Sequence, residues 1–250
     1  MLSVQFHPNW PHGARTVVEA MVGDGVYRSQ FATGISNGGL TAFPGGERWR
    51  WESRLFGGRY DEQPGAARPV YGVWNRREDA YGGAIRFGSS YLRLKPEVVE
   101  RATFCFPDSA FAPEDCGGRE TLPELCALAD AARSDDLDDY VEAQIHGPVE
   151  FAADVDAVVL DPSFAGTPIE AAASELGCPI EYHPGFRGTP ATFDPAYRGP
   201  ETVALAQQLG PELTPYLLGN PAREHPPQAI KYVWHCLARY GRAQYQSRTS

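Results

Sequence analysis

The chain has 250 residues, of which 42% are hydrophobic and 12% aromatic, a composition typical of a folded protein with a packed core and not of a disordered chain. Its formal net charge of −10 argues against non-specific binding to nucleic acid or to an anionic membrane surface. The five cysteines show no CxxC spacing, so we expect reduced thiols. The N-terminus has no basic and apolar leader, and no run of about 18 apolar residues occurs, so we expect a cytoplasmic location and no membrane span.

Hydrophobic spacing, together with Gly and Pro, predicts many short strands interrupted by helices. In the first half, the predicted strands cover residues 3–7, 25–31, 69–74, 86–94 and 103–106. A helix is predicted at residues 13–22, and a short helix or a turn at residues 96–101. In the second half, strands are predicted at residues 140–146, 155–160 and 179–183, and helices at 122–133, 168–176, 201–209 and 227–242. Residues 107–121 and 185–200 are rich in turn-forming residues and are predicted as connections. This pattern favours an α+β fold.

The predicted strand at residues 140–146 carries an unusual polar row. Because side chains alternate between the two faces of a strand, Glu142, Gln144 and His146 share one face. An acid, an amide and an imidazole in one row suit a binding or catalytic site. A solvent-facing row without a function is the alternative that this pattern leaves open.

Two further features lie nearer the N-terminus. His7 ends the first predicted strand, immediately before Pro8, which places its imidazole at a strand edge. Residues 33–39 are mostly small and include Thr33, Gly34 and Ser36, so their backbone N–H groups could form an anion-binding loop. The alternative for His7 is a structural histidine that is hydrogen-bonded to a backbone carbonyl. The alternative for residues 33–39 is a wide turn without a ligand.

A second polar row follows from the predicted strand at residues 86–94. Alternation places Ser89, Tyr91 and Arg93 on one face of it, and Tyr71 offers an aromatic surface beside a glycine on the preceding strand. An ordinary strand with one polar side is the alternative, since Tyr is a good strand former.

Four arginines gather between Pro44 and Asp61, at positions 48, 50, 54 and 59. They could form a local basic patch, but for most of them ordinary surface solvation and ion pairing is the favoured interpretation.

Several enzyme classes find no support in the sequence. The chain has no G-x-S-x-G elbow, no Walker ending, no G-x-G-x-x-G spacing and no HExxH. Glu142 and His146, with His7, His12 or His183, could ligate a metal, although their spacing matches no closed zinc pattern.

The order of these pieces resembles the ADP-ribosyltransferase fold. The resemblance rests on Phe6-His7-Pro8, a helix at residues 14–22, Asp24-Gly25-Val26-Tyr27, and a late strand, Val141-Glu142-Ala143-Gln144-Ile145, followed by Gly147-Pro148-Val149. It implies a split, mixed or antiparallel β core with flanking helices over residues 1–165. Residues 166–250 are then expected to form a mainly helical extension packed on that domain.

The same resemblance implies NAD as co-substrate. Glu142 would be the catalytic carboxylate, His7 would bind the nicotinamide-side ribose, and Tyr71 or Tyr91 would stack on the nicotinamide. The expected NAD-binding set is completed by Thr33, Gly34, Ser36, Ser89 and Gln144. Tyr140 stands where many arginine-modifying members carry a Glu or Gln, so the acceptor could be another protein side chain, a nucleic-acid base or water.

Three other segments, at residues 31–41, 51–58 and 86–94, look like a bacterial family described as domain of unknown function 3626. That second resemblance spans most of the chain and implies no particular activity.

Three hypotheses about function follow. The leading one is an NAD-consuming ADP-ribosyltransferase or NAD glycohydrolase that depends on Glu142. The second is a metal-assisted hydrolase that uses histidines with Glu142. The third is a non-catalytic binding module on the same fold.

Overall fold

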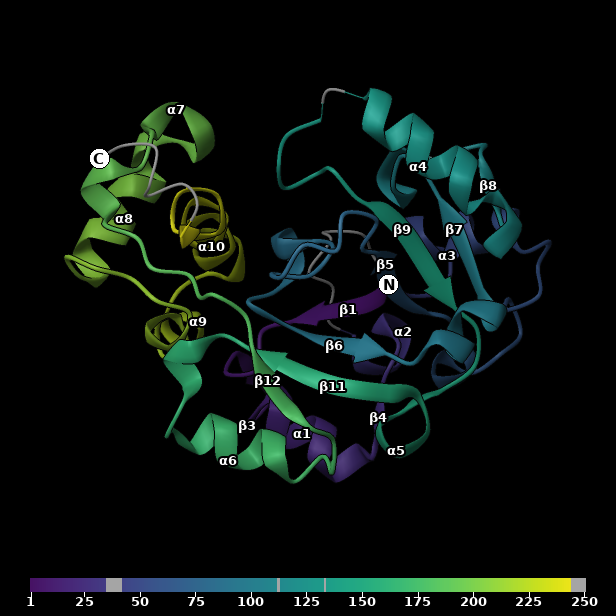
Figure 1. The fold of residues 1–250 in the computed structure, drawn as a ribbon, viewed down its shortest axis with the longest axis horizontal. Helices are drawn as coiled ribbons and strands as arrows, with labels where there is room; N and C mark the ends of the chain where they lie inside the picture. Colours follow the sequence, from purple (N-terminus) through teal and green to yellow (C-terminus); the bar gives the residue numbers. More distant parts are fainter. Residues whose placement is uncertain (35–41, 112, 133, 244–250) are drawn as a thin grey trace.

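The computed structural model describes residues 1–34, 42–111, 113–132 and 134–243, which form an α+β fold around one open sheet (Figure 1). Within these residues the sheet has eight strands, and all neighbours are antiparallel except the parallel pair β11–β12 at one edge. From that edge the order is β12 (Ile180–Tyr182), β11 (Val155–Leu160), β6 (Ser90–Leu94), β1 (Leu2–Phe6), β5 (Val70–Trp74), β9 (Val141–Ile145), β7 (Ala102–Cys105) and β8 (Cys116–Gly117). The expected α+β class is confirmed.

One face of the sheet is apolar and forms the main core. Leu2, Val4 and Phe6 of β1 lie in this core with Val141, Ala143 and Ile145 of β9. Residues of α1 (Val17–Asp24), α4 (Leu122–Ala131) and α6 (Pro168–Ser174) pack into the same cluster. Alternation along the strands therefore leaves the polar residues to the opposite face.

The register between strands brings those polar residues into neighbouring positions. Tyr71 is paired with Gln144, Val73 with Glu142, and Gln5 with Tyr91. Because directly opposite residues of antiparallel strands point to the same side, one face of the sheet carries the polar rows predicted around Glu142 and Tyr91, together with Gln5 and Tyr71.

The central strands β1 and β5 pair at one end only. Their partners are Leu2 with Trp74 and Ser3 with Val73, whereas β5 and β9 are paired over all five residues of each strand. Beyond Ser3 the strands β1 and β5 therefore separate. Gln5 of β1 and Tyr71 of β5 lie in the part of the sheet where no backbone pairing joins these two strands.

Helix α1 begins later than the sequence predicted. Residues 11–16 form a hairpin, β2 (Pro11–His12) and β3 (Arg15–Thr16), whose turn contains Gly13 at φ 61°. Gly13 permits this left-handed conformation without the strain that a Cβ would bring. Thr16 then caps the helix, and the helix ends at Gly25, also left-handed at φ 69°.

Removing this cap gives a first prediction. The Thr16 side chain accepts a hydrogen bond from the Glu19 N–H at 3.4 Å, and the Glu19 carboxylate accepts one from the Thr16 N–H at 2.6 Å. We expect Thr16→Ala to lower the free energy of unfolding by about 1 kcal/mol, measured by urea denaturation. Thr16→Ser keeps the hydroxyl and is the matched control, so equal losses in both variants would contradict the capping role.

Three other predicted elements have different limits. The predicted strand at residues 25–31 is reduced to β4 (Val26–Tyr27), because Ser29 caps the short helix α2 (Gln30–Thr33). The predicted strand at residues 86–94 starts only at Ser90, after a 3-10 turn and the close approach of Gly88 to the Phe6 backbone, where an added Cβ would lie 2.3 Å from Phe6 N. The predicted connection at residues 107–121 contains strand β8, which pairs with β7.

The sequence analysis missed helix α3 (Glu47–Leu55) altogether. Its aromatic and charged composition concealed the helical period, although the buried residues Arg48, Trp51 and Glu52 follow the i, i+3, i+4 spacing of a helix face.

The remaining elements are short. Strand β10 (Val149–Glu150) pairs with β4, and helix α5 (Phe151–Asp154) follows it. The 3-10 turns lie at Gly65–Ala67, Ile85–Phe87, Pro96–Arg101, Ser109–Phe111, Arg119–Thr121, Pro162–Phe164, Pro190–Thr192 and Tyr216–Leu218.

The C-terminal helices gather at one side of the sheet, around α10 (Figure 1). They are α7 (Pro195–Arg198), α8 (Pro200–Leu209), α9 (Pro221–Glu224) and α10 (Pro227–Tyr240). A second core cluster joins them to Tyr81 and Ile85, and the Trp234 indole donates to the carbonyl of Ile85 at 3.0 Å. None of the helices in the described part of the chain is long and apolar enough to cross a membrane.

Candidate functional site

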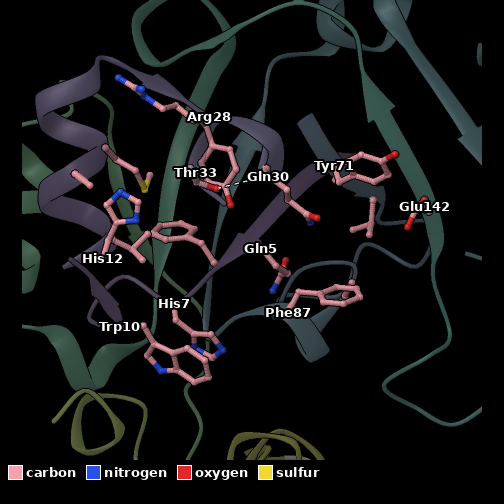
Figure 2. Close-up of a pocket in the computed structure, with 18 of the residues that line it drawn as sticks. Gln5, His7, Trp10, His12, Arg28, Gln30, Thr33, Tyr71, Phe87 and Glu142 are labelled. Carbon is pink, nitrogen blue, oxygen red and sulfur yellow. Dashed lines mark hydrogen bonds between the residues drawn. The ribbon is translucent and has the colours of Figure 1, made fainter. Parts of the chain in front are cut away.

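A cavity of about 180 Å³ lies where β1 and β5 separate. It is lined by side chains from β1, β5, α1, β4, α2 and α3 and by Glu142 of β9. Figure 2 shows Glu142 and Tyr71 at one end of this cavity and His7, stacked on Trp10, at the other, with Gln5 and Phe87 between them. The cavity thus brings together four of the residues predicted for NAD binding and catalysis, His7, Thr33, Tyr71 and Glu142.

Glu142 is buried with an exposed fraction of 6% and held by side-chain donors. Ser109 Oγ donates to Glu142 Oε2 at 3.0 Å, and Gln144 Nε2 donates to Glu142 Oε1 at 3.0 Å. Burial raises the pKa of Glu142 to about 7, a change that the positive charge of Arg48 opposes and that of the nearby Asp108 carboxylate reinforces. The carboxyl group is therefore oriented by hydrogen bonds and can exchange a proton near neutral pH.

Tyr71 is held by a buried network behind the cavity. Its hydroxyl donates to Glu52 Oε1 at 3.0 Å, and Arg68 Nη1 lies 2.7 Å from Glu52 Oε2 in an ion pair in which both side chains are buried. Arg48 lies over the Tyr71 ring, with Cζ 3.9 Å from the ring centroid. Helix α3 supplies Arg48 and Glu52 one turn apart, so a single helix face both orients Tyr71 and places a cation beside Glu142.

Arg48 has donors that remain unused among the described residues. Its exposed fraction is 3%, and its Nε and Nη1 atoms have no hydrogen-bond partner in the described part of the chain. A buried guanidinium with free N–H groups beside a cavity is suited to an anionic or hydroxyl-bearing ligand, because an unmet buried donor costs free energy.

The opposite end of the cavity is aromatic. The His7 and Trp10 rings are stacked with centroids 3.9 Å apart, and the Trp234 ring meets His7 edge-on at 4.8 Å. Burial lowers the pKa of His7 to about 3, so its imidazole is neutral at physiological pH. A neutral imidazole offers one donor and one acceptor nitrogen, which suits recognition of a hydroxyl group.

The other predicted site residues are distributed differently. Thr33 lines the cavity, and Gln144 lies behind Glu142 as its hydrogen-bond donor. Gly34 forms the left-handed end of α2 at φ 67° and is not part of the cavity wall. Ser36 lies outside the described residues, as does most of the small-residue loop.

Tyr91 lies on the polar face of the sheet, and Ser89 directly precedes β6, but neither residue lines the cavity. The Tyr91 hydroxyl donates to the Ala80 carbonyl at 3.2 Å, and His183 Nε2 lies 2.7 Å from the Ser89 carbonyl. The segment after β5 and the residues after β12 therefore cover this part of the face. Of the two tyrosines considered for stacking, Tyr71 is the one that the cavity exposes.

Of the histidines considered as metal ligands, His7 and His12 line the cavity with Glu142, whereas His146 and His183 do not. A 2.6 Å hydrogen bond joins His146 Nδ1 and the Tyr60 hydroxyl, and His183 Nε2 is hydrogen-bonded to the Ser89 carbonyl. In the part of the chain that the structure describes, no group of three or more His, Cys, Asp or Glu side chains is arranged to hold a metal ion.

Sequence reasoning missed Arg48, Asp108 and Ser109 as members of the site. Arg48 was considered only as one of four arginines that could form a basic patch, most of them expected at the surface, because α3 was not recognised as a helix. Ser109 and Asp108 lie in a segment predicted only as a connection, and no local pattern distinguishes them. The helical spacing of Arg48 and Glu52 was the one signal available.

Comparison with known proteins supplies the family. The family model described as "Protein of unknown function (DUF3626)" matches residues 1–129 and 119–214. No curated protein matches the chain. Because the two matches cover most of the 250 residues, the chain belongs to the DUF3626 family.

Proposed function

We propose that this protein is an NAD-consuming enzyme, an ADP-ribosyltransferase or NAD glycohydrolase, in which Glu142 is the catalytic carboxylate. The observation that carries the proposal is the convergence of His7, Tyr71 and Glu142 on one cavity. His7 directly follows β1, and Tyr71 and Glu142 lie in β5 and β9, so the three come from strands that are neighbours in the order β1, β5 and β9. These are the residue types and the strand positions expected from the resemblance to the ADP-ribosyltransferase fold.

The separation of β1 from β5 adds support. A split core was expected from that resemblance, and here the two central strands pair over two residues before they diverge around the cavity. A ligand in this cavity would lie beside backbone N–H and C=O groups of β1 and β5, which would bond to each other if the two strands paired along their whole length.

The chemistry of Glu142 suits cleavage of the nicotinamide–ribose bond. As that bond breaks, positive charge develops on the ribose, and a buried carboxylate stabilises this charge more strongly in the transition state than in the ground state. The same carboxylate would accept a hydrogen bond from the ribose 2′-hydroxyl. Its pKa of about 7 implies that the active, ionised form becomes dominant above neutral pH.

From the remaining contacts we propose which half of the cavity each part of NAD would occupy. Arg48 covers one face of the Tyr71 ring, so a nicotinamide would stack on the other face. His7, neutral and at the opposite end, would bind ribose hydroxyl groups. Pockets that enclose drug-sized ligands measure roughly 300–1,000 Å³. A cavity of about 180 Å³ therefore encloses only part of the dinucleotide.

The test is incubation of the reduced protein with NAD labelled in the ADP-ribose part. We expect release of free nicotinamide, with the label recovered as ADP-ribose if water is the acceptor and on protein or nucleic acid if either is the acceptor. Glu150→Gln, an exposed change of the same kind outside the cavity, is the control and is expected to keep wild-type activity. Absence of nicotinamide release together with absence of a thermal shift in NAD would overturn the proposal.

A further inference from the structure

Two of the five cysteines lie directly opposite each other in the sheet. Cys105 ends β7, Cys116 begins β8, and the two residues are paired across this antiparallel ladder (Figure 1). Opposite residues in such a pair have Cα atoms about 4.5 or 5.5 Å apart, and disulfides span Cα separations of about 4.4–6.8 Å. The paired backbone positions therefore already lie within the range that a disulfide spans.

The same pair touches the candidate catalytic carboxylate. Cys105 is fully buried, and its thiol donates to Glu142 Oε1 at 3.8 Å. Gln144 Nε2, which also donates to Glu142, lies 3.3 Å from Cys105 Sγ. Any change in the position or protonation of this sulfur therefore changes the surroundings of Glu142.

The two cysteines also enclose the segment that forms one wall of the cavity. Asp108 and Ser109 lie between them and line the cavity, and Ser109 donates to Glu142. A covalent link between Cys105 and Cys116 would tie the two ends of this segment together across the strand ladder.

We propose that Cys105 and Cys116 form a redox modification site, which a hydroperoxide oxidises to a disulfide and which thereby changes the hydrogen bonding of Glu142. The formation of the disulfide is independent of the proposed function, whereas its effect on NAD cleavage rests on that function. All five cysteines lie within the described residues and are unpaired in the reduced protein.

The reaction proceeds in two steps. Cys116 is partly exposed and is the more accessible sulfur. When Cys116 ionises, the Cys105 thiol can donate to it in place of Glu142, which holds the pKa of Cys116 below the usual value for cysteine, so the Cys116 thiolate attacks first. It displaces hydroxide from hydrogen peroxide and becomes a sulfenic acid. Cys105 then attacks this sulfur and releases water, so that two thiols and one peroxide give one disulfide and two waters.

The first arm of the test maps the disulfide. Peptide mass mapping after treatment with hydrogen peroxide is expected to show a Cys105–Cys116 cross-link with the loss of two hydrogens. Cys116→Ser is expected to abolish the cross-link, and Cys126→Ser, which removes a half-buried thiol elsewhere, is expected to leave it unchanged. In Cys105→Ser, the sulfenic acid on Cys116 has no resolving thiol and is expected to react with a 1,3-diketone probe. If peroxide-treated wild-type protein lacks the cross-link, the proposal is overturned.

The second arm measures Glu142 without relying on activity. The thiol of Cys105 donates to Glu142 in the reduced protein and has no proton to donate in the disulfide, so oxidation is expected to move the titration of the Glu142 carboxyl to higher pH. The ¹³C carboxyl signal, assigned by its absence from Glu142→Gln, reports this shift. A cross-linked protein whose Glu142 titration is unchanged would overturn the link to the site. If reduced protein releases no nicotinamide, the proposed function fails while both arms of this test still give a result.

Discussion

Glu142→Gln is expected to lower the rate of nicotinamide release about a hundredfold or more while making the folded protein more stable above neutral pH. The loss of activity follows from removal of the negative charge that would stabilise the developing ribose cation. The gain in stability follows from the position of Glu142, which is buried, with a pKa raised to about 7 by that burial. A side chain that lowers stability in its ionised form is typical of a functional group.

The sign of the stability change can be worked out from the pKa. The ordinary value for this carboxyl is 4.5, and in the folded protein it is about 7. Between these values the unfolded chain loses its proton first, so stability is full below about pH 4.5 and falls as the pH rises to about 7. One pKa unit corresponds to about 1.4 kcal/mol, so the cost above pH 7 is on the order of 3 kcal/mol.

Urea denaturation at pH 4.5 and pH 8 is the measurement. Glutamine cannot ionise, so the variant is expected to match the wild type at the lower pH and to exceed it at the higher pH. Glu150→Gln, at an exposed position, is expected to change neither value. A variant less stable than the wild type at pH 8 would show that the ionised carboxylate of Glu142 contributes to stability.

The second large effect is expected from Arg68→Met. Arg68 and Glu52 form an ion pair with exposed fractions of 3% and 0%, and Glu52 also accepts the Tyr71 hydroxyl. Removing the guanidinium leaves a buried carboxylate without its cation, a change that typically costs about 3–5 kcal/mol. Without Arg68, the pKa of Glu52 rises in the folded state, and ionisation of this buried carboxyl lowers the stability of the fold. The loss in the free energy of unfolding is therefore expected to grow as the pH rises above the ordinary pKa of a glutamate.

The exposed pair of Arg119 and Glu100 provides the control for this prediction. Its side chains have exposed fractions of 68% and 62%, so Arg119→Met is expected to cost less than about 1 kcal/mol in the same denaturation experiment. Adding Glu52→Gln to Arg68→Met is expected to recover part of the loss, because the unpaired charge is removed. Equal costs for Arg68→Met and Arg119→Met would contradict the role assigned to the buried pair.

Local sequence patterns determined which side chains share a face. The alternation at residues 140–146 correctly placed Glu142 and Gln144 on one side of β9, and that at residues 3–7 identified the strand that positions His7. The limits of β11 were correctly predicted as well, since an apolar run between turn residues is a local signal. These features depend on neighbours one to four residues away, and one sequence is enough to show them.

Tertiary structure decided which of these polar residues meet a cavity. The same face carries Tyr71 and Tyr91, yet the segment after β5 covers Tyr91, whereas the separation of β5 from β1 leaves Tyr71 beside the cavity. Arg48 is more than 90 residues from Glu142 in the chain, and only the packing of α3 brings its charge to that carboxylate. Burial and charge depend on what packs against a face from distant parts of the chain, and no local period encodes that.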